Sequence, residues 1–193
     1  MARTKEFNET EVLEKAVQVF WEKGYNGTSM QDLVERLGIN RASLYATFGD
    51  KHRLFEKAVL KYRESTKNYV QNYLYSHTSV KEGFLKLFIQ SMDESLSDEN
   101  SKGCFMVNST TELIPHDSKI LCAVDQNRLE FEEIFFDYLN IGVKNHEISP
   151  KKDIKAISSY LFLLQNGLKV ITKFDKNRNK LIKSIKLALS VLD

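Results

Sequence analysis

Apolar residues recur at intervals of three and four along nearly the whole chain, and this spacing constrains its fold more than any other feature. Residues three or four positions apart on an α-helix share one face, so the pattern predicts a series of amphipathic helices. The chain has only 8 Gly and 2 Pro in 193 residues, little of the turn chemistry that a many-stranded β protein requires. The sequence therefore predicts an all-α fold of about nine helices.

Helix-start signals divide this pattern into segments. Residues 28–31 and 79–82 fit the capping box, in which a hydroxyl and a Glu or Gln three positions later satisfy free backbone N–H groups. Other N-cap candidates are Asn8 or Thr10, Asn40, Asp50, and Ser149 followed by Pro150. Three short helices are expected before residue 50, and longer ones over about 51–75, 80–96, 119–142, 150–173 and 178–191, with 97–118 the least regular stretch. We expect a three-helix domain over 1–50 and a larger helical bundle over 51–193.

Residues 28–48 have the sequence shape of a helix-turn-helix. Two short helices are joined by a turn containing Gly38, and the second, over 41–48, would turn Leu44 and Phe48 toward the core. Its other side carries Arg41, Ala42, Ser43, Tyr45 and Thr47. Arg pairs with guanine, Ser reads several bases and the Ala methyl contacts thymine, so these residue types suit a DNA major groove. The pattern alone also fits a solvated helix face.

Charge does not decide between these two interpretations. A DNA-binding module is expected to carry excess positive charge. The net charge of the whole chain is +2, but residues 1–53 hold eight Lys and Arg against eight Asp and Glu. The argument for DNA binding therefore rests on position.

The detailed residues favour DNA binding strongly. They are Val12-Leu13, Ala16, Phe20, Gly24-Tyr25, Thr28-Ser29-Met30, Leu33, Gly38-Ile39, Ser43-Leu44-Tyr45, Phe48-Gly49-Asp50-Lys51 and Leu54-Phe55. This set closely resembles the signature of the TetR (tetracycline-repressor) family, without a gap and over roughly a quarter of the chain. The resemblance implies an all-helical homodimer that binds operator DNA and, through a C-terminal domain, a small-molecule effector. It implies a repressor more often than an activator.

The resemblance also implies roles for single residues. Thr28 matches a phosphate-contacting position, Tyr45 a tyrosine that meets the DNA backbone and Lys51 the lysine that opens the fourth helix. Arg41, Ala42 and Ser43 match positions that approach bases. Thr47 replaces a frequent histidine near phosphate, and Lys15 stands where a small residue is usual. Arg3 and Lys5 form either an arm that reaches DNA or a solvated terminus.

The last two predicted helices favour a homodimer. Residues 154–171 are apolar on more than one face, and 181–192 add a second apolar stripe, so two copies can form a four-helix interface. A purely intrachain core is the alternative. The family resemblance favours the interface, which we place within residues 150–192.

An effector cavity is expected in the C-terminal bundle. Phe84, Phe88 and Met92 share a helix face and, with Phe131 and Phe162, suit an apolar pocket with few polar anchors such as Asn108 or Gln165. The same residues also serve as ordinary core. If they line a pocket, the effector is a small apolar or aromatic molecule.

Other function classes find little support. The four His residues are scattered without metal-ligand spacing, and no Gly-rich phosphate loop or nucleophile motif occurs, so we expect no metal, no cofactor and no enzymatic activity. No apolar run is long enough to span a membrane and no signal peptide begins the chain, which favours the cytoplasm. Cys104 and Cys122 are either inert thiols or a redox switch. The competing function is a helical ligand-binding or enzymatic protein whose N-terminal module does not engage DNA.

Overall fold

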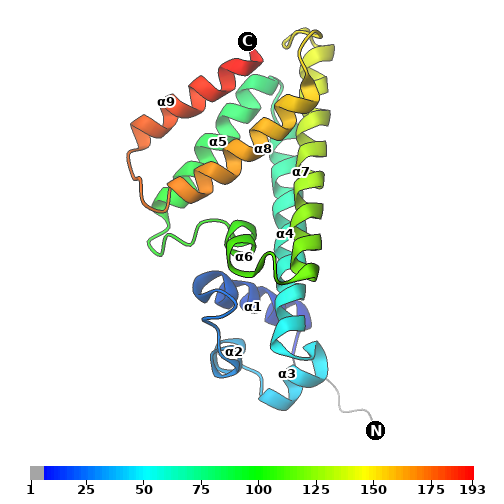
Figure 1. Ribbon diagram of the computed structural model, residues 1–193, viewed down its shortest axis with the longest axis vertical. Helices are drawn as coiled ribbons and strands as arrows, with labels where there is room; N and C mark the ends of the chain where they lie inside the picture. Colours follow the sequence, from blue (N-terminus) through cyan, green and yellow to red (C-terminus); the bar gives the residue numbers. More distant parts are fainter. Residues whose placement is uncertain (1–6) are drawn as a thin grey trace.

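The computed structural model describes residues 7–193, and within that range the chain forms nine α-helices and no β-strand (Figure 1). Arg3 and Lys5 lie outside the described residues. The helices are α1 (Glu9–Lys23), α2 (Met30–Leu37), α3 (Arg41–Phe48), α4 (Lys51–Tyr75), α5 (Val80–Ser97), α6 (Phe105–Leu113), α7 (Ser118–Lys144), α8 (Ile154–Ile171) and α9 (Arg178–Leu189). A short 3-10 turn, Ser190–Leu192, follows α9.

Two long helices, α4 and α7, run side by side along the long axis of the molecule (Figure 1). At one end α1, α2 and α3 gather around the first turns of α4. At the other end α5 and α8 pack beside α4 and α7, α9 packs on α5, and α6 lies between the two groups. Because α4 enters both groups, it joins the two ends of the molecule covalently and by packing.

The apolar core has two parts. The first lies under α1–α3 and also contains residues of α4, α6 and α7: Val12, Ala16, Val17, Val19, Phe20, Leu33, Leu37, Ile39, Leu44, Phe48, Leu54, Phe55, Ala58, Val59, Phe105, Met106, Ile120 and Ala123. The second lies among α4, α5, α7, α8 and α9 and includes Phe84, Phe88, Met92, Phe135 and Tyr138. The three N-terminal helices therefore share their core with the helices that follow residue 50.

Two predicted helix starts are wrong. The N-cap of α2 is Ser29, whose hydroxyl accepts from the amide of Asp32, because the hydroxyl of Thr28 donates instead to the carbonyl of Gly24. Helix α8 begins at Ile154 after the cap Asp153, whereas residues 149–152 form a turn. The caps Asn8, Asn40, Asp50 and Ser79 are confirmed.

Helix α6 corrects the prediction that residues 97–118 are irregular. Phe105 and Met106 are buried in the first core, and this tertiary contact supports a helix with weak local signals. The hydroxyls that suggest a loop donate to carbonyls of the helix itself, Ser109 to Phe105 (2.8 Å) and Thr110 to Met106 (2.8 Å). The missed helix matters because it touches both halves of the molecule.

Glu147, in the turn after α7, fixes the start of α5. Its carboxylate accepts a hydrogen bond from the hydroxyl of Ser79 and from the amides of Val80 (2.8 Å) and Lys81 (2.9 Å). Burial raises the pKa of this carboxyl, but the hydrogen bonds from Ser79, Lys81 and Val80 outweigh it and lower the pKa below its ordinary value. The ionised form is therefore the one that holds α5 against α7.

We expect Glu147→Gln to lower the free energy of unfolding at pH 7 by about 1–3 kcal/mol, the range for hydrogen bonds to a charged group. The native carboxyl has a lowered pKa, so its stabilisation is complete above the unfolded pKa of about 4.3 and disappears as the pH falls through the folded value. Urea unfolding of both proteins at neutral and acidic pH measures this. A difference that does not shrink in acid contradicts it, and Glu99→Gln, at an exposed site, is the control.

Candidate nucleic-acid interface and internal cavity

The helix α3 is held by a cap and two buried side chains. The side chain of Asn40 accepts from the amide of Ser43 (2.8 Å), and Gly38, with φ 69°, closes α2 in the left-handed conformation that glycine adopts without strain. Leu44 and Phe48 are buried in the first core, as predicted. The opposite face of α3 is thereby fixed toward solvent.

That solvent face carries the residues of α3 that were predicted to contact DNA. Arg41, Ala42 and Tyr45 are exposed, and Ser43 and Thr47 are half-buried. The guanidinium of Arg41 lies over the ring of Tyr45, 5.6 Å from its centroid, and donates weakly to its hydroxyl (3.4 Å). With 41% of its surface exposed, Tyr45 is not a packing residue. The helix α3 thus offers a short row of donors and small side chains with no carboxylate among them.

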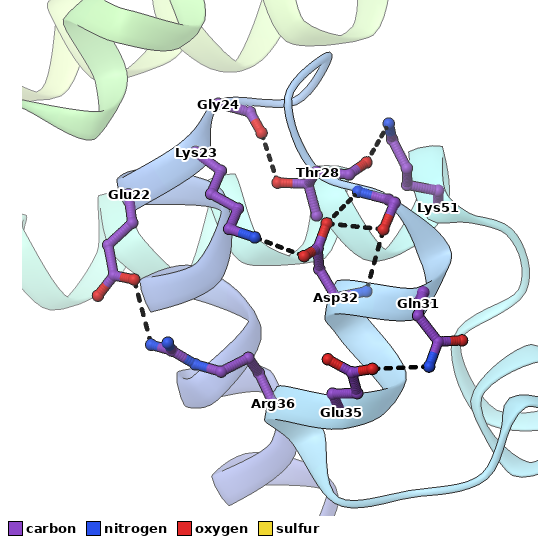
Figure 2. Close-up of polar contacts among 10 residues, drawn as sticks. Glu22, Lys23, Gly24, Thr28, Gln31, Asp32, Glu35, Arg36 and Lys51 are labelled. Atoms are coloured by element: carbon purple, nitrogen blue, oxygen red, sulfur yellow. Dashed lines mark hydrogen bonds and ion pairs between the residues drawn. The ribbon is translucent and has the colours of Figure 1, made fainter.

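The structure gives Thr28 and Lys51 internal roles. Thr28 is 1% exposed, and its hydroxyl donates to the carbonyl of Gly24 (2.6 Å). The ammonium of Lys51 donates to the carbonyl of Thr28 (2.7 Å; Figure 2). It also lies 4.3 Å from the centroid of the Tyr25 ring. These contacts tie the segment between α1 and α2 to the start of α4.

Ion pairs fix α2 against α1 (Figure 2). Asp32 completes the capping box with Ser29 and pairs with Lys23, and Glu22 pairs with Arg36 (3.1 Å). The hydrogen bond from Lys23, followed by those from Ser29, lowers the pKa of Asp32 well below its ordinary range. We call α1–α3 the N-terminal unit. Several of its charged side chains pair with one another on α1 and α2, away from α3.

Helix α6 contacts the N-terminal unit through its two ends. The carboxylate of Glu112 accepts from the amides of Tyr25 (2.9 Å) and Asn26 (2.7 Å), and the indole of Trp21 donates to the carbonyl of Gly103 (3.1 Å). Gly24 has φ 74°, and a Cβ there would lie 2.8 Å from the Glu112 carboxylate. The position of α6 therefore sets the position of the segment between α1 and α2.

A cavity of about 310 Å³ lies beside α6, between the two ends of the molecule. Its wall consists of Trp21, Tyr62, Ser65, Thr66, Tyr69, Val70, Leu87, Ser91, Glu94, Cys104, Met106, Asn127, Phe131, Phe162, Gln165, Asn166 and Lys169, from six helices. The rings of Trp21 and Tyr62 meet edge to face at 5.1 Å. Trp21 belongs to α1, so the cavity wall includes a side chain of the N-terminal unit.

The structure divides the residues predicted to bind the effector. Phe131 and Phe162 line the cavity, with ring centroids 6.1 Å apart. Phe84, Phe88 and Met92 do not: they are buried in the second core, where Phe84 packs on Phe135 at 5.3 Å. The reason is the orientation of α5, which turns another face, with Leu87, Ser91 and Glu94, toward the cavity.

The polar anchors divide in the same way. Gln165 lines the cavity, whereas the side chain of Asn108 bonds to the carbonyl of Lys102 (2.8 Å) and to the ammonium of Lys173 (2.7 Å), outside it. Sequence reasoning missed Trp21, Tyr62 and Lys169, because helices far apart in the chain bring them together. Lys169 did leave a signal, a charge within the apolar run of α8.

Comparison with known proteins identifies the family. Residues 12–58 match the family described as bacterial regulatory proteins, tetR family. The chain is 36% identical over its full length, and over the full length of the relative, to the uncharacterized HTH-type transcriptional regulator YezE of Bacillus subtilis (strain 168). The chain belongs to the TetR family. It is therefore an all-α, DNA-binding transcriptional regulator.

Two further relatives agree with this assignment. The HTH-type transcriptional repressor ComR of Escherichia coli (strain K12) is 28% identical, with 93% of this chain and 86% of ComR covered. A TetR-family regulator, CifR, solved as a cysteine mutant with 26-base-pair operator DNA, superposes with a TM-score of 0.87 at 26% identity, and both chains are fully covered. The matched relatives are regulators of transcription.

Residues 7–193 contain no cluster of His, Cys, Asp and Glu that could hold a metal ion. In the same part of the chain, none of the helices has the length and apolar character needed to cross a membrane.

We expect Thr28→Val to lower the free energy of unfolding by about 0.5–1.5 kcal/mol, because it removes the hydrogen bond to Gly24, and to leave operator affinity almost unchanged. Thermal unfolding and a DNA-binding titration measure the two effects, and Thr47→Val, on the solvent side of α3, is the matched control. If Thr28→Val weakens DNA binding while its stability is unchanged, the result contradicts this expectation and supports the phosphate contact that the sequence predicts.

Proposed function

We propose that this protein is a homodimeric repressor that leaves its operator when a small molecule fills the cavity beside α6. The observation that carries the proposal is the position of Trp21. This residue belongs to α1 of the N-terminal unit, which we propose reads DNA (the reading unit), and its side chain also lines the cavity. A bound molecule contacts the reading unit directly through this side chain. We place this role in the cytoplasm, with regulation rather than catalysis as its purpose.

The surface of α3 supports the DNA-reading part of the proposal. Arg41, Ala42 and Ser43 stand at the N-terminal end of the second helix of a helix-turn-helix, the end that faces base edges in such motifs. Tyr45 and Thr47 follow on the same side and suit backbone contacts. Thr28 and Lys51 act in this proposal as supports that hold the reading unit in shape.

Exposed apolar side chains on α8, on α9 and on the segment between them support the homodimer. They include Tyr160, Leu163, Val170, Ile171, Phe174 and Leu187, of which Leu163 is 69%, Phe174 72% and Leu187 77% exposed. Solvation of so many large apolar side chains is unfavourable, and a second copy packed on the same faces removes them from water. A dimer joined here carries two α3 helices, one for each half of an inverted-repeat operator.

Contacts of α6 support the release step. A molecule in the cavity displaces or holds Trp21 and the residues beside Gly103, and α6 carries Glu112 at its other end. A shift of α6 therefore moves the segment between α1 and α2 and, with it, α3. Because coupling between two sites is reciprocal, the effector weakens operator binding as much as the operator weakens effector binding.

The first test concerns α3. We expect Arg41→Ala to weaken binding to the selected operator by about 1–3 kcal/mol and to relax its sequence preference, since base contacts specify. Tyr45→Ala should weaken all duplexes similarly. Fluorescence anisotropy with DNA from upstream of the protein's own gene, and with a scrambled duplex, measures both. Unchanged binding by both variants would overturn DNA reading by α3.

The second test concerns the dimer. Leu168 and Ile185 are buried within the protomer, so substitutions there damage the protomer core. Leu163→Asp and Leu187→Asp instead place charges on the proposed interface, and we expect them to halve the mass of 44.8 kDa that two 22.4 kDa chains give in light scattering. Leu60→Asp, at an exposed leucine of α4, is the control. A wild-type monomer contradicts the proposed dimer.

The third test concerns coupling. Glu112→Gln keeps the shape of the side chain but replaces one carboxylate oxygen with an NH2 group that cannot accept, so one of the hydrogen bonds from Tyr25 and Asn26 is lost and the other is no longer charge-assisted. We expect this variant to bind operator with affinity within about threefold of wild type, because α3 is intact, and to respond less to effector. Operator titrations with and without a bound small molecule measure the coupling. An unchanged response excludes Glu112 from the release step.

A further inference from the structure

Lys169 carries an ammonium group into the cavity without a carboxylate to neutralise it. Its Nζ donates to the carbonyl of Ser91 (3.1 Å) and to the hydroxyl of Ser95 (3.1 Å), which leaves one of its three donors free. Among residues 7–193, no ion pair within 4.0 Å involves this lysine. Burial lowers the pKa of Lys169, which expresses the cost of holding this charge away from water.

Glu94 lines the same cavity but does not serve as the missing partner. It is an exposed residue, and its carboxylate accepts from the hydroxyl of Tyr69 (3.4 Å) and the amide of Gln90 (3.0 Å). The interactions with Cys104 and, after it, with Glu94 raise the pKa of Lys169 less than burial lowers it. The fixed protein groups therefore leave the ammonium short of negative charge.

Gln165 is the second incomplete polar group in the cavity. Its Oε1 is buried and accepts no hydrogen bond from any described residue. Gln165 and Lys169 are four positions apart on α8, so they share one face, with Cβ atoms about 5–6 Å apart. Within the described part of the chain, one face of α8 thus presents an ammonium group with no ion-pair partner and, one turn earlier, an amide oxygen that accepts no hydrogen bond.

Part of the wall suits a flat apolar body. Trp21, Tyr62, Phe131 and Phe162 contribute rings to the lining, beside several polar side chains, and the volume of about 310 Å³ is at the small end of ligand pockets. Aromatic side chains pack favourably against a ligand ring face to edge or offset. A molecule that fits this site is therefore small and aromatic.

On the basis of the proposed function, we propose that the effector is a small aromatic acid, with an anionic oxygen bound by Lys169 and a neighbouring hydroxyl or amine donating to Gln165. The anion compensates the ammonium for the solvation that it loses on burial, and the hydrogen bond from the lysine to the anion is charge-assisted. Because Lys169 and Gln165 are neighbours on α8, the acid and the donor lie on the same edge of the ring.

Three probes of nearly equal size test this class with the full-length protein. They are 3-hydroxybenzoate, its neutral methyl ester, and benzoate, which lacks the hydroxyl. In calorimetric titrations we expect the hydroxy acid to bind roughly tenfold more tightly than the ester and severalfold more tightly than benzoate, as hydrogen bonds to charged and neutral groups predict. A change in the fluorescence of Trp21, the single tryptophan, reports binding in this cavity.

Variants assign each preference to its residue. Lys169→Met should bind acid and ester equally, and Gln165→Leu should bind hydroxybenzoate and benzoate equally. Lys173→Met is the matched control, because its ammonium donates to Asn108 outside the cavity, and it should keep both preferences. If a variant fails to fold, the comparison of acid with ester on the wild type decides alone.

Equal binding of acid and ester by the wild type, a preference that persists in Lys169→Met, or no binding of any probe overturns the aromatic-acid class. Operator binding, measured without probe, tests the proposed function separately. Operator binding without acid selectivity overturns the ligand class alone. Acid selectivity without operator binding overturns the repressor and leaves the ligand class standing.

Discussion

The packing of Phe55 is the contact that holds the N-terminal helices against α4 and α6. This side chain of α4 is fully buried, and its ring meets Phe20 of α1 at 5.0 Å, Tyr25 at 5.0 Å and Phe105 of α6 at 5.6 Å. Phe105 meets Tyr62 at 5.5 Å, and Tyr62 meets Trp21 in the cavity wall. Close-packed interiors shift between discrete arrangements rather than deform gradually, so this continuous set of rings offers the proposed release step a path from the cavity to α1.

This packing explains why the cavity lies where it does. A cavity deep among α5, α7, α8 and α9 would touch only the second core, which has no member in α1–α3. The observed cavity lies at the edge of both cores and includes Met106 of the first and Phe131 of the second. In the proposed function, filling this cavity affects the two cores together, which is the arrangement that a ligand-responsive regulator needs.

Local signals in the sequence predicted most of the fold, and tertiary contacts explain what they missed. Caps and apolar spacing were enough for α1, α3, α4 and α5, because Asn8, Asn40, Asp50 and Ser79 act on their own helices. Helix α6 was missed because burial of Phe105, rather than a cap, supports it; its N-cap, Cys104, makes no side-chain hydrogen bond. Periodicity placed Phe84 on an apolar face correctly, but it does not say which neighbour that face meets.

The absence of net positive charge over residues 1–53, which argued against DNA binding, has a structural explanation. Carboxylates of this segment pair with cations on α1 and α2, as Asp32 does with Lys23 and Glu22 with Arg36, so these charges cancel locally. Helix α3 itself carries Arg41 and no Asp or Glu. Salt screens exposed charges beyond a Debye length of about 8–10 Å, so a DNA phosphate beside α3 responds to the nearby arginine more than to the segment's total. The charge that matters for recognition is the charge at the contacting face, and there it has the sign that DNA requires.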